Sequence, residues 1–344
     1  MKIQDLKNQE IEKNPGINKN FFNVKSENLD LSCKFYKGSF YLDSFYFFPI
    51  TNEYFSFSNL YGWKESKKHQ HFFENDFSSN FIANKDKFKI IENAVILGLS
   101  AANNYYRNLI SFLPRIFFVL NKEVNIVIHR NSSNKVRDFI KQILSNKGIK
   151  LKRFIYLDDD FYFFRNCEIP QFFSEQDSIK ILNKISLENT NKKNRLYLTR
   201  KNCEYRKLIN ESEIVEYLKS KNFKIIDTDN LSINEQIDFF SSAEIVIGPT
   251  GSALTNIVFC KKNTKIFEIT PDYKYNFEIQ FQKRFSNICK ILGLQYTALT
   301  AEPVENHLKK NIKFINKETA EKSNYYKNLL IREKKIKELN FNSL

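Results

Sequence analysis

One stretch in the second half of the chain constrains its fold more than any other: residues 244–268 read EIVIGPTGSALTNIVFCKKNTKIFE. The apolar, β-branched run 244–247 predicts a buried strand. Residues 248–252 contain two glycines and a proline, which predicts a turn. Residues 253–259 predict a short apolar helix, and residues 265–269 predict a second strand. A parallel sheet with a crossover helix produces this order, which places the turn at the carboxyl end of a strand.

A turn of this kind suits a bound anion, because the amide N–H groups that begin a helix have no partner within the helix and the dipole favours negative charge. Gly248 and Gly251 would let the backbone approach a phosphate closely. Thr250, Ser252 and Asn256 would add hydroxyl and amide groups at the rim of this turn. The alternative is a strand–turn–helix corner that binds nothing, since the spacing is not the dinucleotide fingerprint. Spacing alone leaves both interpretations open.

The same stretch resembles the signature of glycosyltransferase family 61, the DUF563 group that includes capsular polysaccharide biosynthesis proteins. Members carry a strand, a G-P-H-G-A-x-L-T-N-like loop and helix, and a strand that ends in glutamate. The matching residues here are Gly248, Pro249, Gly251, Ala253, Leu254, Thr255, Asn256 and Glu268. Thr250 departs from the pattern, because many members have histidine at that position.

A second part of the resemblance follows the predicted strand 195–199, where the family shows a strand, an arginine, a loop and an R-x-x-x-N-E run. The matching residues are Arg200, Arg206, Asn210 and Glu211. Two arginines just beyond a strand suit a diphosphate, because guanidinium groups bind phosphate oxygens in a bidentate manner. A pair of surface salt bridges is the alternative. Asn210 with Glu213 also resembles a helix N-cap box.

The first half carries a third match within residues 103–120, which read NNYYRNLISFLPRIFFVL and have helical periodicity broken at Pro114. Family members often read N-Y-Y-H-W-L followed by L-P-R, and Arg107 replaces the usual histidine. The matching residues are Asn104, Tyr105, Tyr106, Leu113, Pro114 and Arg115. The resemblance implies that Asn104, Tyr105 and Arg107 lie on the acceptor side of a cleft. A buried helix with a proline kink is the alternative.

The remaining pattern predicts two βαβ halves. Strands at 91–98, 124–129 and 151–157 with a helix at 134–144 belong to the first half. The second half continues with a strand at 223–227, a helix at 233–242 opened by a Ser232–Glu235 capping box, a helix at 275–292 and a strand at 295–299. We therefore predict an α/β fold of the GT-B-like class, with two Rossmann-like domains facing a central cleft.

The predicted organisation has five parts. They are a polar N-terminal segment (1–30), an aromatic-rich start and Rossmann-like acceptor domain (31–170), a linker (171–194), a Rossmann-like donor domain (195–304) and a basic helical tail (305–344). The net charge of +15 is spread along the chain and denser in the tail, which favours contact with the first half or with an anionic membrane surface. No zinc-finger or RNP-type pattern supports nucleic-acid binding.

The cysteines and the candidate metal ligands predict an intracellular protein without a metal or other cofactor. The five cysteines are odd in number, widely spaced and free of any CxxC pair, which indicates reduced thiols. The run Asp158–Asp160 is interpreted as a structural turn, and the pair His69 and His71 as surface residues without a third ligand. The chain shows no signal peptide and no apolar run long enough to span a membrane. We expect a cytoplasmic protein, in contact with the inner membrane face only peripherally.

The resemblance implies an inverting glycosyltransferase that moves a sugar from a nucleotide sugar to a glycan or lipid-linked glycan acceptor during surface or capsular polysaccharide synthesis. The expected donor-binding residues are Arg200, Arg206, Gly248, Thr250, Gly251, Ser252, Asn256 and Glu268. Glu268 would accept hydrogen bonds from ribose hydroxyls. No general base is identified, because both usual histidines are absent. The alternatives are a catalytically silent relative that binds glycan or nucleotide, and a nucleic-acid-binding protein supported only by charge and aromatic content.

Overall fold

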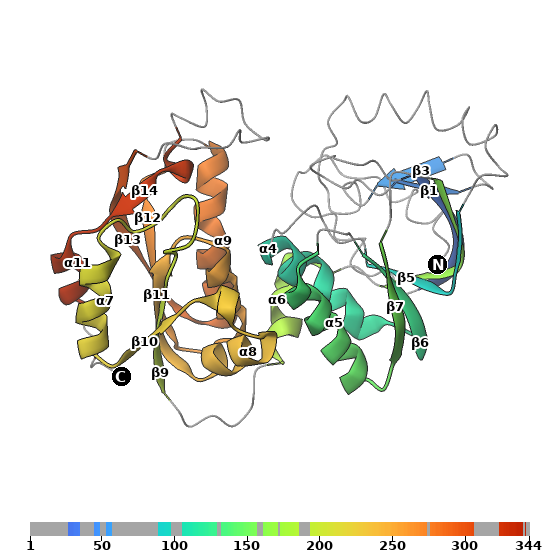
Figure 1. Ribbon diagram of the computed structural model, residues 1–344, viewed down its shortest axis with the longest axis horizontal. Coiled ribbons are helices and arrows are strands. Elements are labelled where there is room, and N and C mark those ends of the chain that lie inside the picture. Colours follow the sequence, from blue (N-terminus) through green and yellow to red (C-terminus); the bar gives the residue numbers. More distant parts are fainter. Residues whose placement is uncertain are drawn as a thin grey trace. The chain divides into compact units, whose positions relative to one another are not determined.

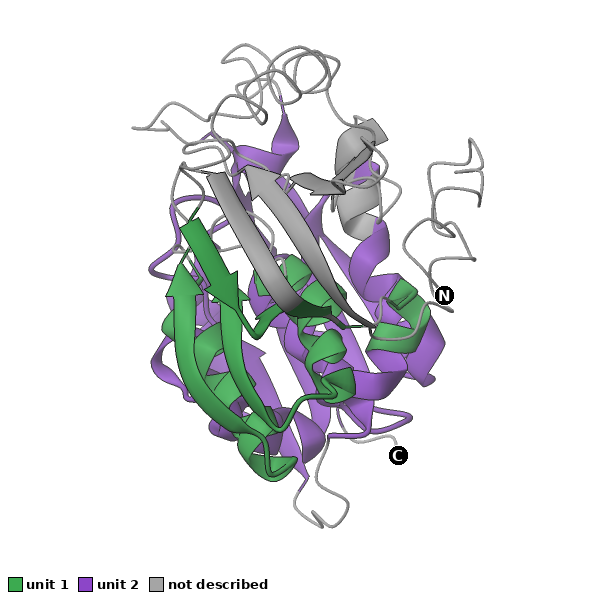
Figure 2. Ribbon diagram, turned by 90° about the vertical axis from the view of Figure 1, so that its right-hand side faces the viewer, with its two compact units in different colours: residues 1–178 green, residues 179–344 purple. Residues whose placement is uncertain are grey.

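A computed structural model describes residues 27–34, 45–48, 53–56, 89–97, 105–128, 132–156, 161–170, 173–185, 193–273, 276–305, 323–339 and 341. The chain divides into two compact units, residues 1–178 and residues 179–344 (Figure 2). Each unit contains its own sheet with parallel strands and packed helices, so the predicted α/β class is confirmed. The parallel pairing in both units is consistent with Rossmann-like folds.

The sheet of the first unit has the strand order β3-β2-β1-β8-β5-β6-β7, and β4 also pairs with β8. Strands β4 to β8 pair in parallel, whereas β1, β2 and β3 form an antiparallel extension along the other edge of β8. The strands are β1 (Glu27–Lys34), β2 (Phe45–Phe48), β3 (Glu53–Ser56), β4 (Lys89–Glu92), β5 (Ala94–Ile96), β6 (Glu123–Ile128), β7 (Lys150–Tyr156) and β8 (Phe161–Ile169). The prediction missed β8, which lies at the centre of this sheet.

The helical segment after β5 changes type twice. It begins as α4 (Tyr105–Arg107), continues as the π-helical turn η3 (Asn108–Phe112) and ends as the 3-10 helix η4 (Leu113–Phe118). The predicted proline break is therefore a change of helix type, because the proline is at the start of η4, where a missing N–H is tolerated. Helix α5 (Asn134–Asn146) follows β6 as predicted.

The second unit has the strand order β10-β9-β11-β12-β13-β14, and every pair is parallel except β13 with β14. Its strands are β9 (Asn194–Leu198), β10 (Phe223–Ile226), β11 (Ala243–Pro249), β12 (Lys265–Pro271), β13 (Gln295–Val304) and β14 (Asn328–Leu330). The predicted strands of this half all form. Parallel pairing brings the carboxyl ends of β9, β11 and β12 to the same edge of the sheet.

Helices cover both faces of the second sheet (Figure 1). On one face lie α7 (Glu211–Ser220) and α11 (Glu333–Lys337), and on the other lie α8 (Ile233–Ser241), η6 (Ser252–Phe259) and α9 (Asn276–Leu292). Short 3-10 turns η5 (Thr228–Asn230) and η7 (Asn324–Tyr326) complete the unit. The capping box Ser232–Glu235 is present at the start of α8. The box predicted at Asn210 is wrong, because its side chain caps nothing and donates to the Ile331 carbonyl at 2.8 Å.

Two segments that looked polar from the sequence contribute buried residues. Helix α6 (Glu175–Asn183) occupies part of the predicted linker and buries Ile179 and Leu182 completely. The described part of the basic tail forms η7, β14 and α11 rather than one helix, and Leu329 and Ile336 enter the core of the second unit. No helix among the described residues is both long and apolar enough to cross a membrane.

Candidate functional site

The glycine loop lies at the carboxyl end of β11. The backbone N–H of Thr250 donates to the Ile269 carbonyl at 2.8 Å, which ties the loop to the neighbouring strand β12. Helix η6 begins directly after Gly251, and no side chain caps this helix start. The loop therefore presents the opening turn of a helix at the edge where β9, β11 and β12 end, which is the arrangement that favours anion binding.

Arg200 lies directly against this loop. A Cβ built on Gly251 would be 1.9 Å from Nη1 of Arg200, so the guanidinium occupies the space that any side chain at position 251 would need. Nη2 donates to the Tyr205 carbonyl at 3.1 Å, and the backbone N–H donates to Glu211 at 3.3 Å. The prediction that Gly251 leaves room for a phosphate is corrected: this glycine makes room for the arginine.

Gly248 also serves packing rather than ligand approach. A Cβ at this position would lie 2.8 Å from Cβ of Leu198 on the adjacent strand β9. A contact that short does not occur between real Cβ atoms, so the missing side chain permits β9 and β11 to pack closely. The predicted role of Gly248 in phosphate approach has no open space to support it in this structure.

Arg206 is the second buried guanidinium of the site. Its backbone is in the left-handed region at φ +57°, and its side chain is only 7% exposed. Its Cζ lies 4.2 Å from the ring centroid of Tyr325 and 4.9 Å from that of Tyr205. Burial lowers the pKa of Arg200, and the neighbouring positive charge of Arg206 lowers it further.

Neither arginine has its charge balanced by an ion pair within the part of the chain that the structure describes. Arg200 is 9% exposed, and Nε of both Arg200 and Arg206 is buried without a hydrogen-bond partner. Burying a charge without an ion-pair partner is expensive. Two such cations next to each other favour the binding of an anion with more than one negative charge. The alternative prediction of surface salt bridges is wrong for both residues.

Glu268 lies beneath the loop with no exposed surface. Its Oε2 accepts a hydrogen bond from the Tyr296 hydroxyl at 2.7 Å, while Oε1 is buried without a partner. Burial raises the pKa of Glu268 to about 7, against the opposing effects of Thr250, Tyr296 and Arg206. In this conformation the carboxyl group contacts Tyr296 and is not open to a ribose, so the predicted ribose contact gains no support from its position.

The three residues predicted on the rim have different environments. Ser252 is exposed, whereas Thr250 and Asn256 are buried. The Asn256 side chain donates to Gln236 Oε1 at 2.8 Å and to the Ala253 carbonyl at 3.1 Å, which joins η6 to α8. Asn256 therefore stabilises the start of η6 from the buried side. Its prediction as a residue on the rim of the loop is wrong.

Sequence reasoning missed the aromatic residues of the site. Tyr205 forms close ring contacts with Tyr325 and Tyr326, at centroid distances of 6.0 and 5.4 Å, and Tyr273 lies 6.5 Å from Tyr325. Tyr205 adjoins Arg206 in the sequence, so a tyrosine–arginine pair was visible there. The tyrosines of the tail carried no such signal, because more than a hundred residues separate them from Arg206.

The residues predicted on the acceptor side belong to the first unit. Tyr105 and Arg107 are partly exposed on α4, and Tyr106 between them donates to Glu175 at 3.1 Å. Asn104 lies outside the described residues. Arg115 is completely buried and donates to the carbonyls of residues 96, 97 and 170, so it stabilises the first unit.

The absence of a metal site stays a prediction. Among the described residues, no group of three or more histidine, cysteine, aspartate or glutamate side chains could hold a metal ion. The Asp158–Asp160 run and the histidines His69 and His71 lie outside the described residues. Cys167, Cys203, Cys260 and Cys289 form no disulfide in the structure.

Comparison with known protein families gives a match. The family described as Glycosyltransferase 61 matches residues 70–267, which is more than half of the chain. The matched span contains α4, both buried arginines and the glycine loop. It ends before Glu268 and before Tyr325 and Tyr326. No curated protein matches the chain.

Proposed function

This chain belongs to glycosyltransferase family 61 and is a glycosyltransferase, and we propose that its donor is a nucleotide sugar bound through the diphosphate at Arg200 and Arg206. The acceptor in this proposal is a glycan or lipid-linked glycan of a surface or capsular polysaccharide, and transfer inverts the anomeric carbon. The two units would be the Rossmann-like domains of a GT-B arrangement. The protein would be cytoplasmic, with at most a peripheral contact with an anionic membrane.

One observation supports the donor site above all: neither of two neighbouring buried guanidinium groups forms an ion pair with a described residue, and one of them, Arg200, lies against the uncapped start of η6. A nucleoside diphosphate supplies the missing negative charge, and its oxygens can accept hydrogen bonds from both guanidinium groups. During transfer, negative charge accumulates on the departing diphosphate. Fixed N–H donors in a dry site stabilise that charge better than water does.

The remaining donor residues divide by environment into direct and supporting roles. Ser252, which is exposed, would contact the diphosphate together with the amides of the loop. Gly251 keeps Arg200 against the loop, Gly248 keeps β11 close to β9, and Asn256 fixes η6. Glu268 supports the loop from beneath, and a ribose contact through it would require the side chain to become exposed.

On the acceptor side, Asn104, Tyr105 and Arg107 remain our candidates for contact with the acceptor. An inverting reaction needs a general base for the acceptor hydroxyl. The two positions where many relatives have histidine carry Arg107 and Thr250, so no base is assigned. We propose that the donor site works without a metal ion, because the buried arginines supply the positive charge that a metal would otherwise provide.

A catalytically silent relative is the second candidate, and the replacement of both usual histidines favours it. The two candidates share nucleotide binding and differ in turnover. Release of nucleoside diphosphate from a nucleotide sugar, with or without added acceptor, supports the enzyme. Tight binding of the same nucleotide sugar without any release supports the silent relative.

The test of the donor site begins with thermal unfolding in the presence of a panel of nucleotide sugars and the corresponding nucleoside diphosphates, because a ligand that binds the folded state raises the melting temperature. We expect at least one nucleoside diphosphate to stabilise the parent protein. Calorimetric titration should then show a large loss of affinity in Arg200→Ala and in Arg206→Ala.

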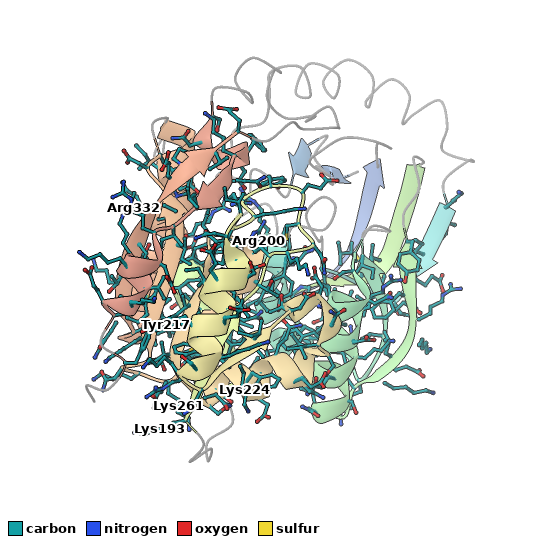
Figure 3. The ribbon with its side chains drawn as sticks, turned by 60° about the vertical axis from the view of Figure 1, so that its left-hand side comes forward. Lys193, Arg200, Tyr217, Lys224, Lys261 and Arg332 are labelled. Atoms are coloured by element: carbon teal, nitrogen blue, oxygen red, sulfur yellow. The ribbon has the colours of Figure 1, made fainter. Side chains whose placement is uncertain are left out.

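The matched control is Arg332→Ala, which removes a positive charge from an exposed position at the start of α11. Figure 3 labels both Arg200, in the loop after β9, and Arg332, at the N-cap of α11. The control variant should bind as the parent does. Equal affinity of the parent, Arg200→Ala and Arg206→Ala would refute the donor site.

A further inference from the structure

The described C-terminal residues 323–331, called here the C-terminal segment, contact the loop that carries both arginines. We propose that this segment forms part of the diphosphate site by holding the arginine loop, and that Tyr325 is the positioning residue for Arg206. The proposal rests on the function proposed above and extends it to a part of the chain outside the family match, which ends at residue 267.

The first argument comes from the backbone of Arg206. Its φ of +57° is in the left-handed region, which residues with a Cβ rarely adopt and which persists only where the surroundings hold it. The C-terminal segment provides that hold: the N–H of Arg206 donates to the Lys327 carbonyl at 3.1 Å. Leu329 donates to the Lys207 carbonyl at 2.7 Å, and Ile209 donates to the Leu329 carbonyl at 2.8 Å.

The second argument comes from the guanidinium group. The ring of Tyr325 lies 4.2 Å from Cζ of Arg206, closer than the 4.9 Å to Tyr205. A cation near an aromatic face is attracted by the ring quadrupole. Contact through the flat face of a guanidinium leaves the N–H groups at its edge free to bind phosphate oxygens. Tyr325 can therefore fix the direction of Arg206 without competing for its donors.

The third argument is that the C-terminal segment is itself firmly placed. Ser323 is fully buried, and its hydroxyl accepts from the N–H of Tyr325 at 3.2 Å. Asn324 donates to the Asp272 carbonyl at 2.7 Å, just beyond the end of β12. Leu329 is fully buried in the core of the unit. These anchors give Tyr325 a fixed base from which to hold Arg206.

The experiment measures the affinity of inorganic pyrophosphate, and of the best nucleoside diphosphate for the parent, by calorimetry. Tyr325→Leu should weaken both by about ten-fold, within the range of a cation–π contact at a partly buried site. Tyr325→Phe keeps the ring and should stay within about two-fold of the parent, which is the rescue expected of a contact made through the ring.

Tyr217→Leu is the matched control. Tyr217 also packs partly buried against the core of the same unit, and its ring lies within 5.8 Å of Lys221 and 5.7 Å of Lys337. It lies on α7, whereas Arg200 is in the loop that follows β9 (Figure 3). The variant should leave pyrophosphate affinity unchanged, which separates the loss of a ring over Arg206 from the loss of a tyrosine elsewhere.

The outcomes are distinguishable from those that test the donor site. If the parent binds neither pyrophosphate nor any nucleoside diphosphate, the proposed function fails. If the parent binds and Arg206→Ala does not, while Tyr325→Leu binds as the parent does, the donor site stands and the role of Tyr325 is refuted. Equal losses in Tyr325→Leu and Tyr325→Phe also refute it. If Tyr325→Leu does not fold, Tyr325→Met, whose unbranched and flexible side chain adapts better to the space that the ring leaves, decides in the same way.

Discussion

The guanidinium of Arg200 occupies the space beside Gly251 that a side chain would fill, since a Cβ on Gly251 would lie 1.9 Å from Nη1 and 2.7 Å from Cζ of Arg200. The glycine of the loop after β11 and the arginine of the loop after β9 therefore form one structural unit. Neither residue can be substituted at this site without changing what the other does.

Gly251→Ala should abolish most of the nucleoside-diphosphate affinity while leaving the fold intact. The backbone at Gly251 has φ 170°, which any residue adopts, and the clash is with the end of a flexible side chain that can swing away. Displacing Arg200 removes charge-assisted hydrogen bonds to the ligand, with a loss of roughly 1.5–3 kcal/mol. Calorimetric titration of the folded variant measures this loss.

The control for Gly251→Ala is a double-mutant cycle. In the Arg200→Ala background, the alanine at position 251 has nothing to displace and should reduce affinity little further, so the two effects should not add. Additive losses would mean that Gly251 acts on the ligand independently of Arg200.

Gly248→Ala should reduce stability rather than binding. The new Cβ would meet Cβ of Leu198 at 2.8 Å, and both atoms are fixed to neighbouring strands, so the strands themselves must move. Overpacking of this kind costs roughly 1–3 kcal/mol in free energy of unfolding. Denaturant unfolding measures this loss in the free energy of unfolding. Adding Leu198→Ala to Gly248→Ala should not restore stability, because alanine retains the Cβ that clashes. A variant as stable as the parent would contradict the close packing.

Thr250→Val should weaken nucleoside-diphosphate binding only slightly. The backbone N–H of Thr250 keeps its bond to Ile269, and the buried hydroxyl contributes on the order of one hydrogen bond, about 1 kcal/mol. Titration of the variant beside Arg200→Ala gives the comparison. A loss as large as that of Arg200→Ala would make the hydroxyl a direct ligand.

Glu268→Gln should change how stability depends on pH. Burial raises the pKa of Glu268 from 4.5 to about 7, so the folded protein holds this proton more tightly than the unfolded chain does. The stabilisation by the protonated carboxyl group is fully present below pH 4.5 and is lost as pH rises through about 7. Since each pKa unit corresponds to 1.36 kcal/mol, the free energy of unfolding should fall by about 3 kcal/mol across this range.

Glutamine stays neutral, so the variant should lack this loss between pH 4.5 and pH 7. The measurement is the free energy of unfolding of the parent and of Glu268→Gln across that range, and the difference between the two curves isolates this residue from other titrating groups. Parallel curves would show that Glu268 has an ordinary pKa in the folded protein.

Transferase activity should survive EDTA, because the positive charge at the donor site comes from Arg200 and Arg206. The assay follows nucleoside-diphosphate release with and without chelator, using the nucleotide sugar that stabilises the parent. A complete loss that manganese or magnesium restores would instead assign a metal-binding role, and Asp158→Asn would then be the first variant to examine.

The sequence by itself determined the order of strands β9 to β13 in the second unit and the position of its glycine loop. Strand 244–247 was visible as a run of β-branched residues, and the capping box at Ser232 as a spacing of three, because both signals lie between near neighbours in the chain. The family resemblance also pointed to Arg200 and Arg206, whose role in donor binding stays a prediction. The strand and the capping box depend on local backbone preferences, which a linear pattern records.

Only the tertiary structure decided what these residues contact. The identity and spacing of these residues in the sequence did not reveal that Gly251 makes room for Arg200, or that the Asn256 side chain is buried. Asn210 looked like a helix cap, yet it bonds to Ile331, 121 positions away. The hold of Tyr325 on Arg206 likewise arises when the C-terminal segment pairs with the arginine loop. Such contacts depend on how the sheet brings distant segments together, and spacing in the sequence carries no information about that.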